Sequence, residues 1–169
     1  PIRNQATDVH PPVYYMLLHT VCSFFPESFS MWYGLSLNIL LTLLSLIVLF
    51  FLLRCLIGGN YLPLLFCFLF GMTYGVINNM LFIRMYVLLM LLVTLQYYYH
   101  LHLYYSLLKR VDKWKPRQLI TLSLITITGT LTQYYFLIFL FWLALIFCTV
   151  LLIQKKTKAL LQYICTMAV

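Results

Sequence analysis

The chain has 169 residues, of which 64% are hydrophobic and only 8% are charged, and its mean hydropathy is +0.96. So few polar side chains cannot cover a soluble globule, and the composition therefore indicates a multi-span membrane protein. The net charge of +8 does not indicate a nucleic-acid partner, because the cations lie between apolar segments, where they set topology. The sequence contains no P-loop, Rossmann fingerprint, zinc-ligand spacing or CxxC pair.

Residues 1–30 are expected to form an external loop that contains a short helix. The pair Pro11 and Pro12 holds the preceding segment extended and permits a helix to start after it. Within residues 13–25 the side chains that recur at helical spacing are Tyr14, Leu17, Leu18 and Val21. A helix of about thirteen residues is too short to cross a bilayer, so it is expected to lie along the membrane surface.

Three spans are predicted next, near residues 31–53, 61–77 and 85–108. The first is free of charge and would measure about 34 Å as a helix, enough to cross the hydrocarbon core. The second is short and contains Gly71 and Gly75, whose spacing is typical of helices that approach closely. The third carries five tyrosines in its second half, which places that end at a membrane interface.

Residues 119–153 are uncharged and would form a helix of about 52 Å, too long for a bilayer of about 30 Å. Two short spans are therefore predicted, near 115–131 and 134–153, with a break near 129–133, where polar side chains collect. Residues 159–169 are expected to begin a further, truncated segment. The whole chain, 1–169, is thus expected to be part of one transmembrane domain of a longer protein.

Five spans sort the eleven cations into two unequal groups. Arg3 and Arg84 fall on one side of the membrane. The nine others fall on the opposite side, which is therefore predicted to be cytoplasmic: Arg54, Lys109, Arg110, Lys113, Lys115, Arg117, Lys155, Lys156 and Lys158. The side with two cations receives the opening segment and the turns near residues 78–84 and 130–134, so most unusual polar residues are expected to face outward.

Arg84 is the clearest candidate for a ligand-binding residue. It begins a predicted span, where a cation opposes the helix dipole, so another reason for its position is needed. A phosphate ligand would supply one. The alternative interpretation is an arginine that snorkels to the interface, and the neighbouring polar residues can equally be read as solvated loops.

Three short motifs carry a resemblance to a known family, and they occur in order: His10-Pro11-Pro12-Val13-Tyr14-Tyr15, Arg84-Met85-Tyr86 and Thr132-Gln133-Tyr134-Tyr135. Over about residues 8–152 the chain resembles the bacterial membrane glycosyltransferases related to the protein O-mannosyltransferases and the lipid A aminoarabinose transferase. The resemblance implies an all-α, polytopic transmembrane bundle of the GT-C type. It also implies a polyprenyl-phosphate sugar as donor, an envelope glycan, lipid or protein as acceptor, and an extracytoplasmic active face in a bacterial inner membrane.

The resemblance assigns roles to particular residues. It implies catalytic roles for Asp8 and His10, and contacts to the donor phosphate for His10, Arg84 and Tyr86, because positive charge stabilises a leaving phosphate. The residues that would line the substrate groove are Pro11, Pro12, Tyr14, Tyr15, Asn79, Gln133 and Tyr134. No cofactor or metal site is assigned. The general base of the family is expected in a loop that precedes Pro1.

The chain departs from the family pattern at two places. Leu81-Phe82-Ile83 stands where a Gln-Glu pair usually precedes the arginine, and Gln133 stands where a histidine is usual. Two other classes stay open: a non-catalytic subunit that assembles an envelope complex, and a fragment of a transporter. A transporter usually carries ionisable residues near the bilayer midplane, whereas the middle of each predicted span lacks Asp, Glu, Lys and Arg.

Overall fold

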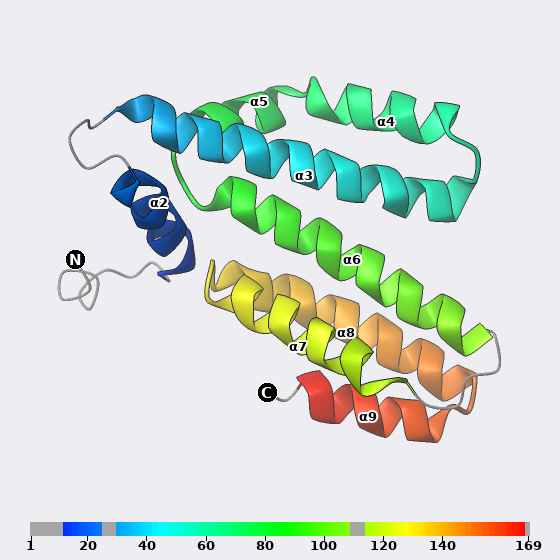
Figure 1. Cartoon of the computed structure of the whole chain (residues 1–169). Coiled ribbons are helices and arrows are strands. Elements are labelled where there is room, and N and C mark those ends of the chain that lie inside the picture. Colours follow the sequence, from blue (N-terminus) through cyan, green and yellow to red (C-terminus); the bar gives the residue numbers. More distant parts are fainter. Residues whose placement is uncertain (1–11, 25–29, 109–113, 168–169) are drawn as a thin grey trace.

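A computed structural model describes residues 12–24, 30–108 and 114–167, and these residues contain helices and no strand. The helices are α2 (Val13–Ser23), α3 (Met31–Ile57), α4 (Tyr61–Gly71), α5 (Tyr74–Leu81), α6 (Tyr86–Leu108), α7 (Pro116–Thr130), α8 (Tyr135–Ile153) and α9 (Thr157–Met167) (Figure 1). The predicted all-α fold is confirmed for this part of the chain. The GT-C type stays a prediction.

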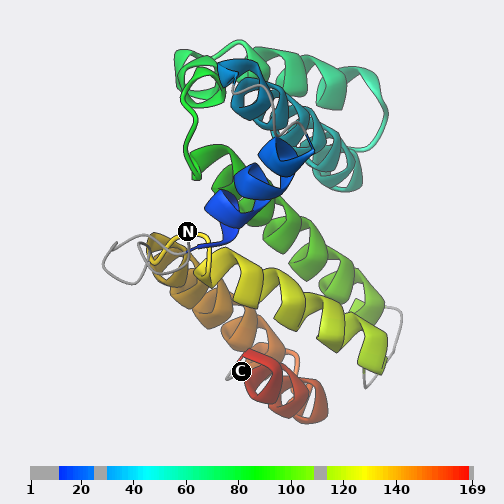
Figure 2. The same cartoon turned by 60° about the vertical axis from the view of Figure 1, so that its left-hand side comes forward.

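The helices form two groups on either side of α6. In Figure 1, α3, α4 and α5 lie on one side of α6, while α7, α8 and α9 lie on the other. Figure 2 shows that α2 lies across this arrangement, between α3 and the group of α7 to α9. The short α2 therefore bridges the two groups at one end of the bundle.

Two of the described helices, α3 and α8, are long and apolar enough to cross a membrane. The pair α4 and α5 would supply a third span if the two helices are counted together, although they are bent by 59°. The structure therefore supports two or three of the five predicted spans. Helix α6 has 23 residues but contains Gln96, His100 and His102, which lower its hydropathy, and α7 has only 15 residues.

The predicted span at 61–77 is wrong as a single helix. Helix α4 ends at Gly71, and Thr73 adopts an extended conformation with φ −66° and ψ 142° before α5 begins. The Thr73 hydroxyl donates a 2.7 Å hydrogen bond to the Phe70 carbonyl, which satisfies one of the free carbonyls at the end of α4. A Cβ at Gly75 would meet nothing within 4 Å, so this glycine is not a close helix contact.

The predicted break near residues 129–133 is confirmed. Helix α7 ends at Thr130 and α8 begins at Tyr135. A Cβ at Gly129 would collide with the ring of Phe136, so the absence of a side chain lets the two helices pack closely beside their turn. The sequence anticipated this turn because Gly129 and the threonines around it are poor helix formers.

Most of the buried apolar side chains form two clusters that share α6. The first contains Tyr14, Leu41, Met85, Val87, Leu88, Leu91, Leu92, Phe136 and Leu140. The second contains Leu103, Leu107, Trp114, Leu122, Phe147, Leu151, Ala159 and Tyr163. Between them along α6 lie the buried polar residues Gln96 and His100. The Gln96 amide donates a 3.2 Å bond to the Thr126 hydroxyl, and His100 Nε2 lies 2.8 Å from the Tyr163 hydroxyl.

The connections between helices lie at two ends of the bundle. The end of α6, the start of α7 and the α3–α4 and α8–α9 connections share one end, and α2 with the α5–α6 and α7–α8 turns share the other (Figure 1). Seven cations are described: Arg84 belongs to the second end, and six belong to the first, namely Arg54, Lys115, Arg117, Lys155, Lys156 and Lys158. This grouping matches the predicted one for the described cations. We refer to the two ends as the cationic end and the α2 end.

Candidate functional site

Asn38 joins three segments at the α2 end. Its side chain is fully buried in the first turns of α3, and its Nδ2 donates to the Phe82 carbonyl at 2.8 Å and to the Met80 carbonyl at 3.1 Å. Its Oδ1 accepts a 2.9 Å hydrogen bond from the Tyr14 hydroxyl. The carbonyls at the end of a helix lack partners within that helix, so Asn38 satisfies the end of α5 and holds α2 beside it.

Tyr14 supports the site from within the protein. Its side chain is fully buried and belongs to the first apolar cluster. Burial raises the pKa of its hydroxyl from 10.0 to about 12, so the group stays protonated and donates to Asn38. The prediction that Tyr14 lines the substrate groove is therefore corrected, because the ring faces the core. Tyr15 is half-buried, and its ring meets that of Tyr14 edge-on at 5.7 Å.

The α7–α8 turn is joined to the same end by a main-chain bond. The amide of Val13, the first residue of α2, donates to the Leu131 carbonyl at 3.4 Å. Thr132 and Gln133 follow in the turn and are buried, whereas Tyr134 is 59% exposed. Of the two residues that were predicted to line a groove here, Tyr134 faces the surface and Gln133 does not.

Arg84 lies exposed between two anchored neighbours. Met85 is 2% exposed and belongs to the first apolar cluster, while the Ile83 side chain fills the space beside Gly34, where a Cβ would come within 2.8 Å of it. The Arg84 amide donates a 2.7 Å hydrogen bond to the Phe82 carbonyl, and its guanidinium lies 5.1 Å from the centre of the Phe82 ring. The backbone is thus fixed on both sides, and the cation stays available to an anionic ligand.

The remaining predicted residues divide into two groups. Tyr86 is 37% exposed at the start of α6, and Asn79 is half-buried in α5, so both belong to the α2 end. Asp8, His10 and Pro11 lie outside the described residues, and Pro12 is the exposed residue that precedes α2. The described ranges contain no Asp or Glu, so no carboxylate within them offsets the charge of Arg84.

The motifs predicted from the sequence therefore meet through hydrogen bonds at one end of the bundle. The segment that begins α2 contacts the Arg84 segment through Asn38, and it contacts the Gln133 segment through Leu131. Sequence reasoning missed Asn38 and Gly34. A signal was present, because an asparagine inside a long apolar helix requires partners for its amide.

Comparison with known proteins identifies no related protein. No protein-family model, no curated protein and no solved structure matches the chain. The composition and the two long apolar helices indicate a membrane protein, and its described residues form helices and no strand.

Proposed function

We propose that the chain belongs to a membrane glycosyltransferase that moves a sugar from a polyprenyl-phosphate carrier to a cell-envelope acceptor. The observation that carries this proposal is the meeting of three motif segments beside an exposed arginine. Tyr14, Asn38 and Phe82 are linked by two short hydrogen bonds, and Arg84 follows two residues later with its guanidinium exposed. An exposed guanidinium on a fixed backbone, with no carboxylate among the described residues, suits a phosphate.

The chemistry follows from the leaving group. An acceptor oxygen attacks the anomeric carbon of the sugar, the bond from that carbon to the phosphate oxygen breaks, and the lipid phosphate departs with the bonding electron pair. Arg84 would stabilise the charge that develops on the departing phosphate, and His10 would contact the same group. Asp8 would orient His10 or assist as an acid, and the acceptor hydroxyl would give its proton to the general base that the family resemblance implies. Tyr15, Asn79, Tyr86 and Tyr134 would bound the sugar and the acceptor at the α2 end.

Membrane orientation is part of the proposal. The six described cations at the cationic end favour a cytoplasmic position for that end, because positively charged loops are retained there. The α2 end would then face outward from a bacterial inner membrane. A polyprenyl-phosphate sugar in the outer leaflet would present its phosphate at the depth where α6 begins.

Turnover by the full-length protein, with any segment that precedes Pro1, tests the proposal in lipid nanodiscs. Release of polyprenyl phosphate from polyprenyl-phosphate sugars would be measured for the wild type, for Arg84→Ala and for the control Arg54→Ala at the cationic end. Loss of a charged group that stabilises the transition state typically lowers turnover by about a hundredfold or more, and we expect that loss for Arg84→Ala alone. Equal turnover in the two variants would exclude the phosphate role of Arg84. A folded wild type without any turnover would favour a non-catalytic assembly subunit.

A further inference from the structure

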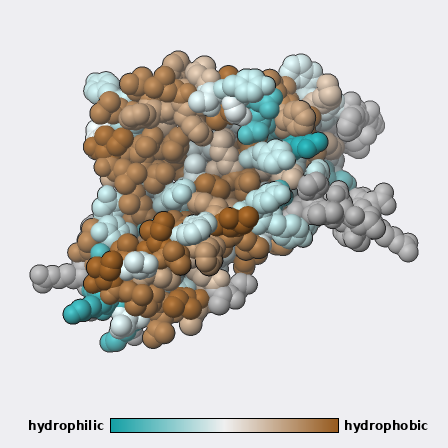
Figure 3. Space-filling model, turned by 180° about the vertical axis from the view of Figure 1, so that it is seen from behind, coloured by the Kyte–Doolittle hydropathy of each residue, from teal (hydrophilic) through white to brown (hydrophobic). Residues whose placement is uncertain are grey.

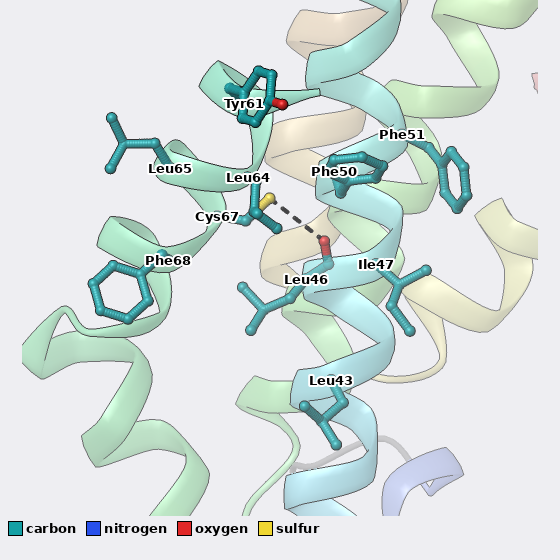
Figure 4. Close-up of a pocket in the computed structure, with 10 residues that line it drawn as sticks. All are labelled: Leu43, Leu46, Ile47, Phe50, Phe51, Tyr61, Leu64, Leu65, Cys67 and Phe68. Atoms are coloured by element: carbon teal, nitrogen blue, oxygen red, sulfur yellow. Dashed lines mark hydrogen bonds between the residues drawn. The ribbon is translucent and has the colours of Figure 1, made fainter. Parts of the chain in front are cut away.

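Two adjoining hollows follow α3 on the side of α4 and α5. The first, about 760 Å³, lies between α3 and α4, where Figure 4 shows Leu46, Leu64 and Cys67 between the two helices. The second, about 420 Å³, extends to Val76 and Met80 of α5. Four residues line both hollows: Leu43, Leu46, Cys67 and Phe68. The hollows are therefore parts of one groove, which we call the α3–α4 groove.

The lining of the α3–α4 groove suits hydrocarbon. Aliphatic and aromatic side chains make up nearly all of it. The Thr42 hydroxyl donates a 2.8 Å bond to the Asn38 carbonyl, and the Cys67 thiol lies 3.6 Å from the Leu46 carbonyl. Both groups are thus paired with backbone, and neither is left to attract a polar ligand. The wider surface on the back of the molecule is also largely hydrophobic (Figure 3).

The groove has the depth of one leaflet and a cation near one end. Along α3 it extends from Ile39 to Phe51, which corresponds to about 18 Å at about 1.5 Å per residue. One leaflet contributes about 15 Å of hydrocarbon, half of the core of about 30 Å. Met80 lines the end of the groove at α5, and Arg84 follows four residues later at the α2 end.

We propose that the α3–α4 groove holds the hydrocarbon chain of a polyprenyl phosphate whose head group binds Arg84. This inference rests on the proposed function, because it places the chain of the same donor lipid. An apolar groove of one leaflet's depth, with an exposed cation close to one end, is complementary to a molecule that has one long hydrocarbon chain and one anionic head. An ordinary membrane phospholipid in the groove is the competing outcome.

A matched pair of substitutions tests the occupant. Leu43 lines both hollows, whereas Leu44 is the next residue of α3, is 40% exposed and lines neither. Binding of a long-chain polyprenyl phosphate to the protein in zwitterionic nanodiscs would be measured for Leu43→Trp and Leu44→Trp. We expect the Kd to rise about tenfold for Leu43→Trp, as for the loss of roughly two buried methylene groups, and to stay unchanged for Leu44→Trp. Equal affinities in the two variants would overturn the proposal.

Photo-crosslinking keeps the test independent of how Leu43→Trp folds. A polyprenyl phosphate with a photoreactive group in its chain should label residues in 39–51 or 61–80 of the wild type, and excess unlabelled polyprenyl phosphate should displace it. Labelling confined to α8, or displacement by phosphatidylcholine as readily as by polyprenyl phosphate, would overturn the groove assignment. If polyprenyl phosphate displaces the label from the groove but the protein shows no turnover, the lipid-binding site is supported and the proposed transferase activity is rejected.

Discussion

The Tyr14 hydroxyl donates to Oδ1 of Asn38 across 24 positions of sequence, and both side chains are fully buried. The same Asn38 amide donates to two carbonyls at the end of α5, so one side chain fixes the relative positions of α2, α3 and the segment before Arg84. Asparagine can do this because its amide combines two donors with an acceptor. The α2 end thus depends on a residue that contacts no part of the proposed ligand.

Asn38→Leu should destabilise the protein by about 3 kcal/mol, because it leaves the Met80 carbonyl and the buried Tyr14 hydroxyl without their Asn38 partner, whereas the Phe82 carbonyl keeps the Arg84 amide. The free energy of unfolding in mild detergent would measure the loss. Asn78→Leu, at an exposed position of α5, serves as the control and should change stability by less than about 0.5 kcal/mol. Similar losses in the two variants would show that the buried hydrogen bonds contribute little.

Because of Tyr14, the free energy of unfolding should decrease as the pH rises above 10. Its pKa is raised to about 12 in the folded protein and is 10.0 without the surrounding structure, so the unfolded state loses the proton first. The stabilisation is fully present below pH 10 and is lost as pH rises toward 12. Tyr14→Phe should therefore be less stable than the wild type at pH 8, and the difference should shrink between pH 10 and 12. A difference that stays constant across this range would contradict the prediction.

Gly129 should not tolerate a side chain. A Cβ there collides with the Phe136 ring, so Gly129→Ala must separate α7 from α8 or move that ring, at a cost of about 2 kcal/mol. Gly75→Ala is the matched control, since a Cβ at that helical position meets open space and should stabilise α5 by up to about 1 kcal/mol. Thermal unfolding of both variants in the same detergent compares them. A stable Gly129→Ala protein would mean that the turn repacks easily.

Cysteine labelling should show that α8 crosses the membrane. In a protein whose native cysteines are replaced by alanine, Tyr134→Cys precedes α8 and Gln154→Cys follows it. A membrane-impermeant maleimide should label Tyr134→Cys in intact cells and Gln154→Cys only after the membrane is opened, as the positive-inside rule requires. Labelling of both positions from the same side would reject α8 as a span.

Much of the helical layout followed from apolar runs and their interruptions. Predicted segments at 31–53 and 134–153 correspond to α3 and α8, and the break after Gly129 was anticipated from poor helix formers. The bend between α4 and α5 was missed, because the pair Gly71 and Gly75 fits close helix packing equally well by spacing alone. The end of α4 depends instead on the extended conformation of Thr73, which no periodicity reveals.

The candidate site was only partly predictable. Its location follows from charge and motif order along the sequence, whereas the residues that hold it in place are determined by tertiary packing. Charge counting and motif order placed Arg84 and the turn at 130–134 on the same side, and the structure joins these segments at one end. Burial could not be read in the same way. Tyr14 and Gln133 are polar side chains in predicted loops or interfaces, yet tertiary packing covers both. The contacts in three dimensions show that Asn38 joins Tyr14 to the segment before Arg84.

The two apolar clusters on α6 also set an order of assembly. Every buried member of the first cluster has been synthesised once Leu140 is complete, whereas the second requires Ala159 and Tyr163 of α9. A chain that leaves the ribosome from its N-terminus can therefore close the α2 end while four members of the second cluster, Phe147, Leu151, Ala159 and Tyr163, are still unmade. The segment around Arg84 would reach its final arrangement before the second apolar cluster, toward the cationic end of the same bundle, is complete.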